Sequence, residues 1–184
     1  MSRRSAPLTP EQAIRLRRIR IIDRRALWSL LRKAAFLALI FYLLFGVFFG
    51  VTTMKGDDMR PKFSAGDILI YYRLYDNYSR NDIVLVSRSE GRYAGRIIGA
   101  PGDRIDITDE GAVVINGAAL YELDIYFQTK PIRDAVEFPI TLGEDEYFIL
   151  GDNRTTAKDS RYFGTVKADE LRGRIVAALR RTDI

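Results

Sequence analysis

The chain contains no cysteine and no histidine in its 184 residues. Without cysteine it has no disulfide framework, no thiol nucleophile and no thiolate metal site. Without histidine it lacks Ser-His-Asp and Cys-His catalytic groups and the commonest zinc ligand. We therefore expect no metal and no cofactor, and any hydrolysis would have to depend on Ser/Lys, Thr, Asp/Glu or Tyr chemistry.

Charged residues are also absent from one long stretch, residues 34–54. Its 21 positions are dominated by Phe, Leu, Ile and Ala. A helix of this length, at about 1.5 Å per residue, spans a hydrocarbon core of about 30 Å. A cleaved signal peptide is the alternative, but its basic region would be too long and no small-residue cleavage pattern follows Val51. We expect one uncleaved transmembrane anchor helix over 34–54.

The segment before this helix, residues 1–33, is strongly basic. It holds ten Arg and Lys against two acidic residues, a net charge of +8, so the remainder carries −3 of the total of +5. A basic block can bind nucleic acid, but the apolar stretch that follows favours a membrane topology signal. Thr9 and Pro10 predict a helix start, and we expect a basic helix along the cytoplasmic lipid surface; an ill-ordered tail is the alternative.

The Lys and Arg bias also predicts the topology. We expect a single-pass plasma-membrane protein with a cytoplasmic N-terminus and with residues 55–184 outside the cell. Membrane lipid is then an expected partner, and nucleic acid is not.

Residues 55–184 are predicted to form a mainly β domain. Seven short runs rich in Ile, Val and Tyr alternate with Gly, Asp and Asn turn signals. The runs are 67–73, 82–88, 93–99, 104–108, 112–115, 146–150 and 174–179. Asn116-Gly117 predicts a tight turn, and the polar segment 121–138 is expected to be a lid or an extra hairpin. We expect a small antiparallel or mixed domain with one core.

Several short motifs follow the apolar segment in a specific order. Residues 56–61 read Gly-Asp-Asp-Met-Arg-Pro, residues 96–103 read Arg-Ile-Ile-Gly-Ala-Pro-Gly-Asp, and residues 151–154 read Gly-Asp-Asn-Arg. Shorter matches occur at 65–68, 81–84, 115–117 and 159–161. Over roughly residues 35–179 this order and spacing resembles the type I signal peptidases (peptidase S26), the membrane-bound Ser/Lys proteases that remove signal peptides.

The resemblance implies the signal peptidase-like fold, a LexA-like Ser/Lys protease β domain tethered by one N-terminal transmembrane helix. It also implies a set of scaffold residues, in which two aspartates act as turn and ion-pair residues with two arginines: Asp152, Asn153, Arg154, Asp159 and Arg161.

Three positions depart from the family pattern. The first family box reads Gly-x-Ser-Met-x-Pro and its serine is the nucleophile, whereas this chain has Asp58. The lysine base directly precedes the Arg-x-x-Gly-x-Pro-Gly-Asp run, where this chain has Gly95. A serine that holds the lysine amine is replaced by Ala157. The resemblance therefore implies a pseudo-signal peptidase with no active catalytic residue.

Asp58 could catalyse hydrolysis as in an aspartic protease only if a second carboxylate shared its proton. Asp57 is adjacent, but neighbouring residues on a strand point to opposite faces. A structural ion pair between Asp58 and Lys158 is a further hypothesis, because a buried carboxylate needs a partner.

The peptide groove of the family could remain. In the resembled enzymes the substrate lies extended beside the nucleophile strand and the lysine strand, by β-augmentation. The matching positions here are apolar: Met54, Met59, Phe63, Tyr93 and Ala94. We expect Gly95 to widen the groove floor and Asp58 to add negative charge. The alternative is that these side chains form plain core or a lipid-facing surface.

Proteins with the same Ser-to-Asp and Lys-to-Gly pair resemble this chain more closely than the active enzymes do. They are the SipA-type accessory proteins of Gram-positive pilus systems. This resemblance implies a membrane-tethered, non-catalytic assembly factor or chaperone acting on pilin precursors or a sortase, with no small-molecule ligand. The alternative is an active signal peptidase I with displaced catalytic groups.

Overall fold

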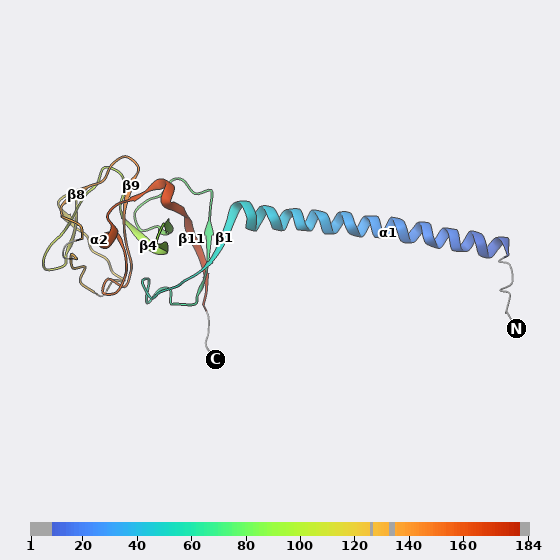
Figure 1. The fold of residues 1–184 in the computed structure, drawn as a ribbon, viewed down its shortest axis with the longest axis horizontal. Helices are drawn as coiled ribbons and strands as arrows, with labels where there is room; N and C mark the ends of the chain where they lie inside the picture. The colour runs from blue at the N-terminus through green and yellow to red at the C-terminus, as the bar shows by residue number, and fades with distance from the viewer. Residues whose placement is uncertain (1–8, 126, 133–134, 181–184) are drawn as a thin grey trace. The chain divides into compact units, whose positions relative to one another are not determined.

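The computed structural model describes residues 9–125, 127–132 and 135–180 (Figure 1). Parts of the predicted basic segment and of the 121–138 segment thus lie outside the described residues. The chain divides into two compact units, Met1–Gly46 and Val47–Ile184, and each is described by itself.

The first unit is helical. Helix α1 spans Pro10–Tyr42 and begins at the residue that the sequence predicts, and a π-helical segment, η1, continues it over Leu43–Phe48. The stretch Arg24–Phe48 has a mean hydropathy of 2.0 in its most apolar window, none of it buried. A helix that is apolar all round and covered by no protein is typical of a membrane span. The structure therefore has one N-terminal helix that is long and apolar enough to cross a membrane.

The anchor helix predicted over 34–54 is wrong at its C-terminal end. Residues Phe49–Thr53 form strand β1, which pairs antiparallel with β2 (Ile68–Tyr72) and places Val51 opposite Ile70. β-Branched residues favour a strand here once a partner is available. An uncharged run alone does not distinguish a short apolar strand from a helix end.

The second unit contains two antiparallel sheets. The larger has the strand order β1-β2-β11-β3-β4-β9-β10 and the smaller β7-β6-β5-β8. The remaining strands are β3 (Ile83–Arg88), β4 (Gly91–Gly99), β5 (Arg104–Ile107), β6 (Val113–Ile115), β7 (Ala118–Ala119), β8 (Ile140–Thr141), β9 (Glu146–Leu150), β10 (Val166–Lys167) and β11 (Leu171–Leu179). The described residues of the unit also form two single-turn helices, α2 (Ser160–Phe163) and the 3₁₀ segment η2 (Ala168–Glu170). The mainly β prediction is confirmed.

The seven predicted runs correspond to β2 to β6, β9 and β11, and the two-residue strands were not predicted. The Asn116-Gly117 turn is confirmed, with φ of 53° and 84°, between β6 and β7. The described residues of 121–138 contain turns but no strand, so they form no extra hairpin.

The single core that the sequence predicts is instead divided into three clusters of buried side chains. One lies under β2 and the 54–63 turn, one between the smaller sheet and β9, and one between β3, β4 and β10. The first cluster supports one wall of the candidate site.

Candidate functional site

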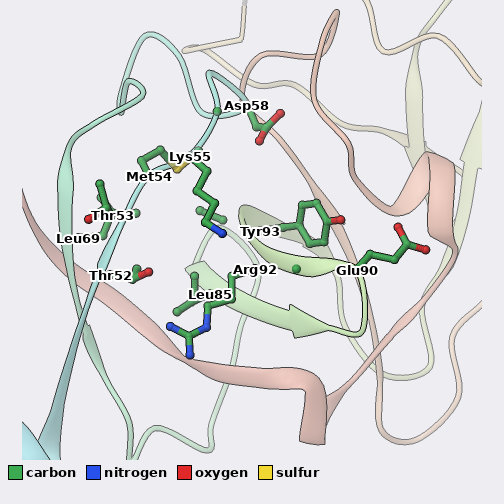
Figure 2. Close-up of a pocket in the computed structure, with 13 residues that line it drawn as sticks. Thr52, Thr53, Met54, Lys55, Asp58, Leu69, Leu85, Glu90, Arg92 and Tyr93 are labelled. Carbon is green, nitrogen blue, oxygen red and sulfur yellow. The ribbon is translucent and has the colours of Figure 1, made fainter.

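A cavity of about 240 Å³ opens between β1 and the N-terminal half of β4 (Figure 2). Strand β1 is at one end of the larger sheet, so its outer edge has no strand neighbour in the described sheet order. In β4, residues 91–95 pair with β3, whereas pairing with β9 starts only at Arg96. Two strand edges therefore border the cavity. Its lining consists of residues 52–56, 58, 69, 85 and 90–94.

Three of the apolar groove candidates, Met54, Tyr93 and Ala94, line this cavity, as does Asp58. The other two, Met59 and Phe63, do not, which corrects the sequence prediction. Both are buried in the first core cluster. The reason is a local turn: the Phe63 N–H donates to the Met59 carbonyl over 3.0 Å. That turn folds the chain back after Asp58 and directs both side chains into the core.

Asp58 is half-buried at the edge of the cavity. Burial raises the pKa of its carboxyl above the usual value, the Lys158 backbone amide opposes this, and the negative charges of Asp159 and Asp57 add to the rise. The hypothesis of an Asp58–Lys158 ion pair is wrong, because the Lys158 amine pairs with Glu90. The Asp58 carboxylate thus interacts with backbone amides, those of Lys158 and of Asp58 itself, and not with the Lys158 amine.

The Lys158 amine interacts with the side chains of Glu90 and Tyr93. Its hydrogen bond to Glu90 is the main reason that its pKa is raised, and a further hydrogen bond to Tyr93 acts in the same direction. Its amine lies 5.7 Å from the centre of the Tyr93 ring. A lysine that accepts a proton from a nucleophile needs a lowered pKa. The exposed amine and the phenol hydroxyl are therefore neighbours, but the pKa of the amine is shifted in the opposite direction.

Gly95 does not widen the cavity floor, which corrects a second expectation. A Cβ placed on Gly95 would lie 2.5 Å from Ile149 Cγ2 and 3.2 Å from the Leu150 carbonyl oxygen. The space that a side chain at this position would enter is thus occupied by β9. Replacing the glycine alone would force Ile149 to move.

The three positions that depart from the family pattern lie around one short segment, residues 149–151. Gly95 faces Ile149, as described above. A Cβ on Gly151 would meet the Asp58 carbonyl oxygen at 2.6 Å and would also overlap the Cβ of Ala157. Ala157 is itself buried. The structure therefore brings the three positions together, without a nucleophile and base among them.

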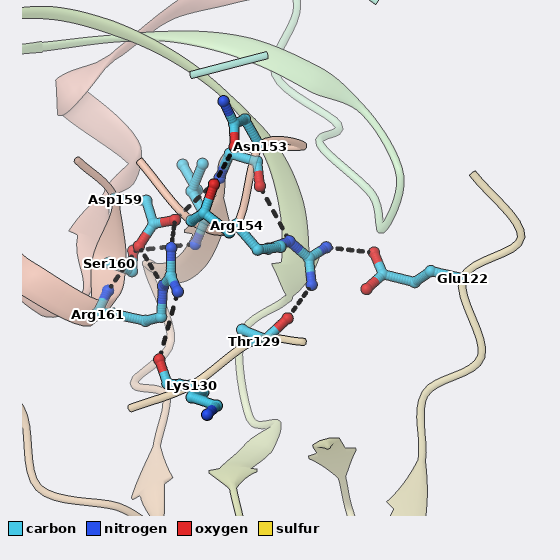
Figure 3. Close-up of polar contacts among 11 residues, drawn as sticks. Glu122, Thr129, Lys130, Asn153, Arg154, Asp159, Ser160 and Arg161 are labelled. Carbon is cyan, nitrogen blue, oxygen red and sulfur yellow. Dashed lines mark hydrogen bonds and ion pairs between the residues drawn. The ribbon is translucent and has the colours of Figure 1, made fainter. Parts of the chain in front are cut away.

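The scaffold residues of the loop after β9 form a dense polar network (Figure 3). Arg154 is buried and donates to the Gly151 carbonyl over 2.9 Å, to the Glu122 carboxylate over 2.6 Å, and to the Thr129 hydroxyl. These contacts fix part of the 121–138 segment to the loop. The sequence predicted Arg154 as a scaffold residue but gave no sign of its partners Glu122 and Thr129.

The two aspartates of the network have different partners. Asp159 pairs with Arg161 through hydrogen bonds of 2.9 and 2.8 Å and accepts the Gly151 N–H. Asp152 pairs with Arg96 over 2.8 and 2.7 Å, not with Arg154, which corrects the expected pairing. Both ion pairs are largely buried.

Asn153 connects this loop to the turn at Asp58. Its backbone N–H donates to the Asp58 carbonyl over 2.9 Å, and its side-chain amide donates to the Asp57 carbonyl over 3.2 Å. Ser160 is fully buried and its hydroxyl accepts the Ile149 N–H, so it is engaged in structure. Within the described residues no cluster of carboxylates could hold a metal ion.

A family model described as signal peptidase, peptidase S26, matches residues 27–179. The chain belongs to this family. The match confirms the resemblance that the sequence motifs indicate. This family consists of serine-type signal peptidases.

This signal peptidase family member is similar to two relatives that are themselves named signal peptidases. It is 34% identical over 134 residues to a Synechocystis protein named Probable signal peptidase I-2, covering 66% of this chain and 58% of the relative. It is 29% identical over 141 residues to Signal peptidase IB of Staphylococcus aureus, covering 67% and 73%. The chain thus spans little more than half of the Synechocystis protein. A crystal structure of a signal peptidase I from Enterococcus faecalis is 30% identical, with a TM-score of 0.45, covering 54% of this chain and 97% of that one.

Proposed function

We propose that this member of the signal peptidase family does not cleave signal peptides. One observation carries the proposal. Asp58 occupies the position expected for the nucleophile, and Gly95 occupies the position expected for the base, with its side-chain space filled by Ile149. A carboxylate that attacked an amide would form a tetrahedral intermediate, and this intermediate expels the carboxylate far more readily than the amine, so that the amide is re-formed. The pKa of Lys158, whose backbone amide contacts Asp58, is raised, whereas a lysine that activates a hydroxyl needs a lowered pKa.

In its place we propose a membrane-tethered accessory or chaperone role in sortase-dependent pilus assembly. The basic segment would lie in the cytoplasm, the apolar helix would cross the plasma membrane, and the β unit would act outside the cell. A pilin precursor or a sortase would bind as an extended segment in the cavity between β1 and β4. The two bordering strand edges support this mode of binding, and the likeness to SipA-type proteins supports the pathway.

The alternative is an active signal peptidase I with displaced groups. The names of the relatives favour it, as does the contact between the Lys158 amine and Tyr93. Against it stands the direction of the Lys158 pKa, which is raised, so that the amine is held as an ammonium ion at neutral pH.

Site-specific photo-crosslinking in intact cells tests the chaperone role. A photoreactive residue at Thr53, which lines the cavity, should yield an adduct with a pilin precursor or a sortase. The same residue at the exposed position Glu144, outside the cavity, is the control. Equal labelling from both positions, or labelling of secretory preproteins alone, would contradict the proposal.

A further inference from the structure

The cavity between β1 and β4 contains a carboxylate without a cationic partner. Asp58 lines the cavity, and none of the ion pairs formed among residues 9–125, 127–132 and 135–180 includes it. The charged side chains that act on it, Asp159 and Asp57, are both anionic. A partly desolvated carboxylate costs free energy unless a cation compensates for the lost water. A cationic ligand is therefore the group that this position would bind best.

The cations near the cavity are directed elsewhere. Lys158 is held by Glu90. Lys55 and Arg92 also line the cavity, and Figure 2 shows Lys55 and Asp58 leaving their turn in different directions, with Arg92 on the β4 side. The Asp58 carboxylate is thus available to an external ligand. The basic side chains of Lys55 and Arg92 lie further along the cavity.

The remaining walls of the cavity favour a peptide side chain that has an apolar stem behind its charged group. Met54, Leu85 and the Tyr93 ring contribute apolar surface, and the two strand edges offer backbone partners for an extended chain. A lysine side chain packs its methylene stem on apolar surface and presents a compact ammonium group with three donors. Both properties match a narrow cavity of about 240 Å³ that has its carboxylate at one edge.

We propose that the cavity recognises an extended peptide segment through a lysine whose ammonium group pairs with Asp58. This inference rests on the proposed function, since it names the chemistry of the segment that the non-catalytic groove would bind. No bond is made or broken. The substitution at the nucleophile position would then replace a reactive group by a recognition group.

Fluorescence anisotropy with the full-length protein in detergent micelles tests this. The probes are labelled Val- and Thr-rich peptides with one central lysine, and matched peptides with norleucine or glutamate in its place. The lysine peptides should bind about tenfold more tightly than the norleucine peptides, the size of a charge-assisted hydrogen bond at a half-exposed site. Added salt should reduce this difference.

Two variants test whether the charge of Asp58 causes the preference for lysine peptides. Asp58→Asn keeps the side-chain shape but removes the charge, so lysine and norleucine peptides should bind it equally. Asp57→Asn is the matched control, because Asp57 pairs with Arg60 and does not line the cavity; it should keep the preference. Equal binding by the wild type, or a preference that persists in Asp58→Asn, would overturn the lysine proposal while leaving peptide binding in the groove intact. If no peptide bound, both the inference and the groove would be refuted.

Discussion

Two regions meet at residues 149–151 and differ in what holds them. On one side, Asp58 takes part in none of the ion pairs among the described residues, and Gly95 and Ala157 carry no polar side chain. On the other, the loop 151–161 is fixed by paired arginines and aspartates, and no buried side-chain nitrogen or oxygen of the described residues lacks a hydrogen-bond partner. Burying charges is tolerated only when they are paired. Removing one partner of a buried pair in the loop should therefore destabilise the fold more than a substitution at Asp58, Gly95 or Ala157.

The contrast extends to packing. Ile149 fills the space beside Gly95. Restoring the family side chains there would act against the existing packing.

The largest effect is expected for Arg154→Met. It leaves Glu122 and the buried Thr129 without their partner, and breaking a buried pair costs about 3–5 kcal/mol. Chemical denaturation of the full-length protein, followed by near-UV circular dichroism, measures the change in the free energy of unfolding. The control is Arg60→Met in the exposed pair with Asp57, where the cost should stay below about 1 kcal/mol. Equal costs for the two variants would remove the distinction between the regions.

Gly95→Lys comes next. The new side chain overlaps Ile149, and overpacking of this kind costs about 1–3 kcal/mol. If Ile149 is the obstacle, Gly95→Lys should cost about 1–2 kcal/mol less in an Ile149→Ala background than in the wild type. A double-mutant cycle of unfolding free energies measures this coupling, and strict additivity would show that Ile149 does not occupy the site.

Asp58→Asn should be mildly stabilising at neutral pH. Because burial raises the pKa of Asp58 in the folded state above 3.8, the folded protein binds this proton more tightly than the unfolded chain. Stability therefore falls as pH rises through the folded pKa, and the asparagine avoids this loss. Solvent screening limits the gain to about 1 kcal/mol or less. Unfolding at several pH values should show the gain disappearing below pH 3.8; a gain of the same size in acid would assign it to another cause.

The smallest effect is expected for Lys158→Met. Its pair with Glu90 is exposed, and such pairs contribute between zero and about 1 kcal/mol. Thermal unfolding of the full-length variant should be close to that of the wild type. A large loss of stability would mean that Lys158 supports the Asp58 turn through its side chain as well as through its backbone.

The strands of the β unit were predictable where a run of at least three residues rich in Ile, Val and Tyr lies between turn residues. The sequence could not separate Phe49–Thr53 from the apolar helix before it, because the strand depends on pairing with β2. Met59 and Phe63 were misassigned because a local backbone turn directs them inward. Asp152 pairs with Arg96, and Gly95 packs against Ile149. Each contact joins residues that are far apart in the sequence, so no local sequence pattern predicts it.

The most direct test of the central claim is cleavage of a secretory preprotein by the purified full-length protein in lipid or detergent. We predict no cleavage by the wild type, and at best feeble cleavage after Asp58→Ser with Gly95→Lys, since Ala157 and Ile149 leave the new lysine poorly positioned. Cleavage by the wild type that disappears in Asp58→Ala or Lys158→Met would show that this site is an active peptidase.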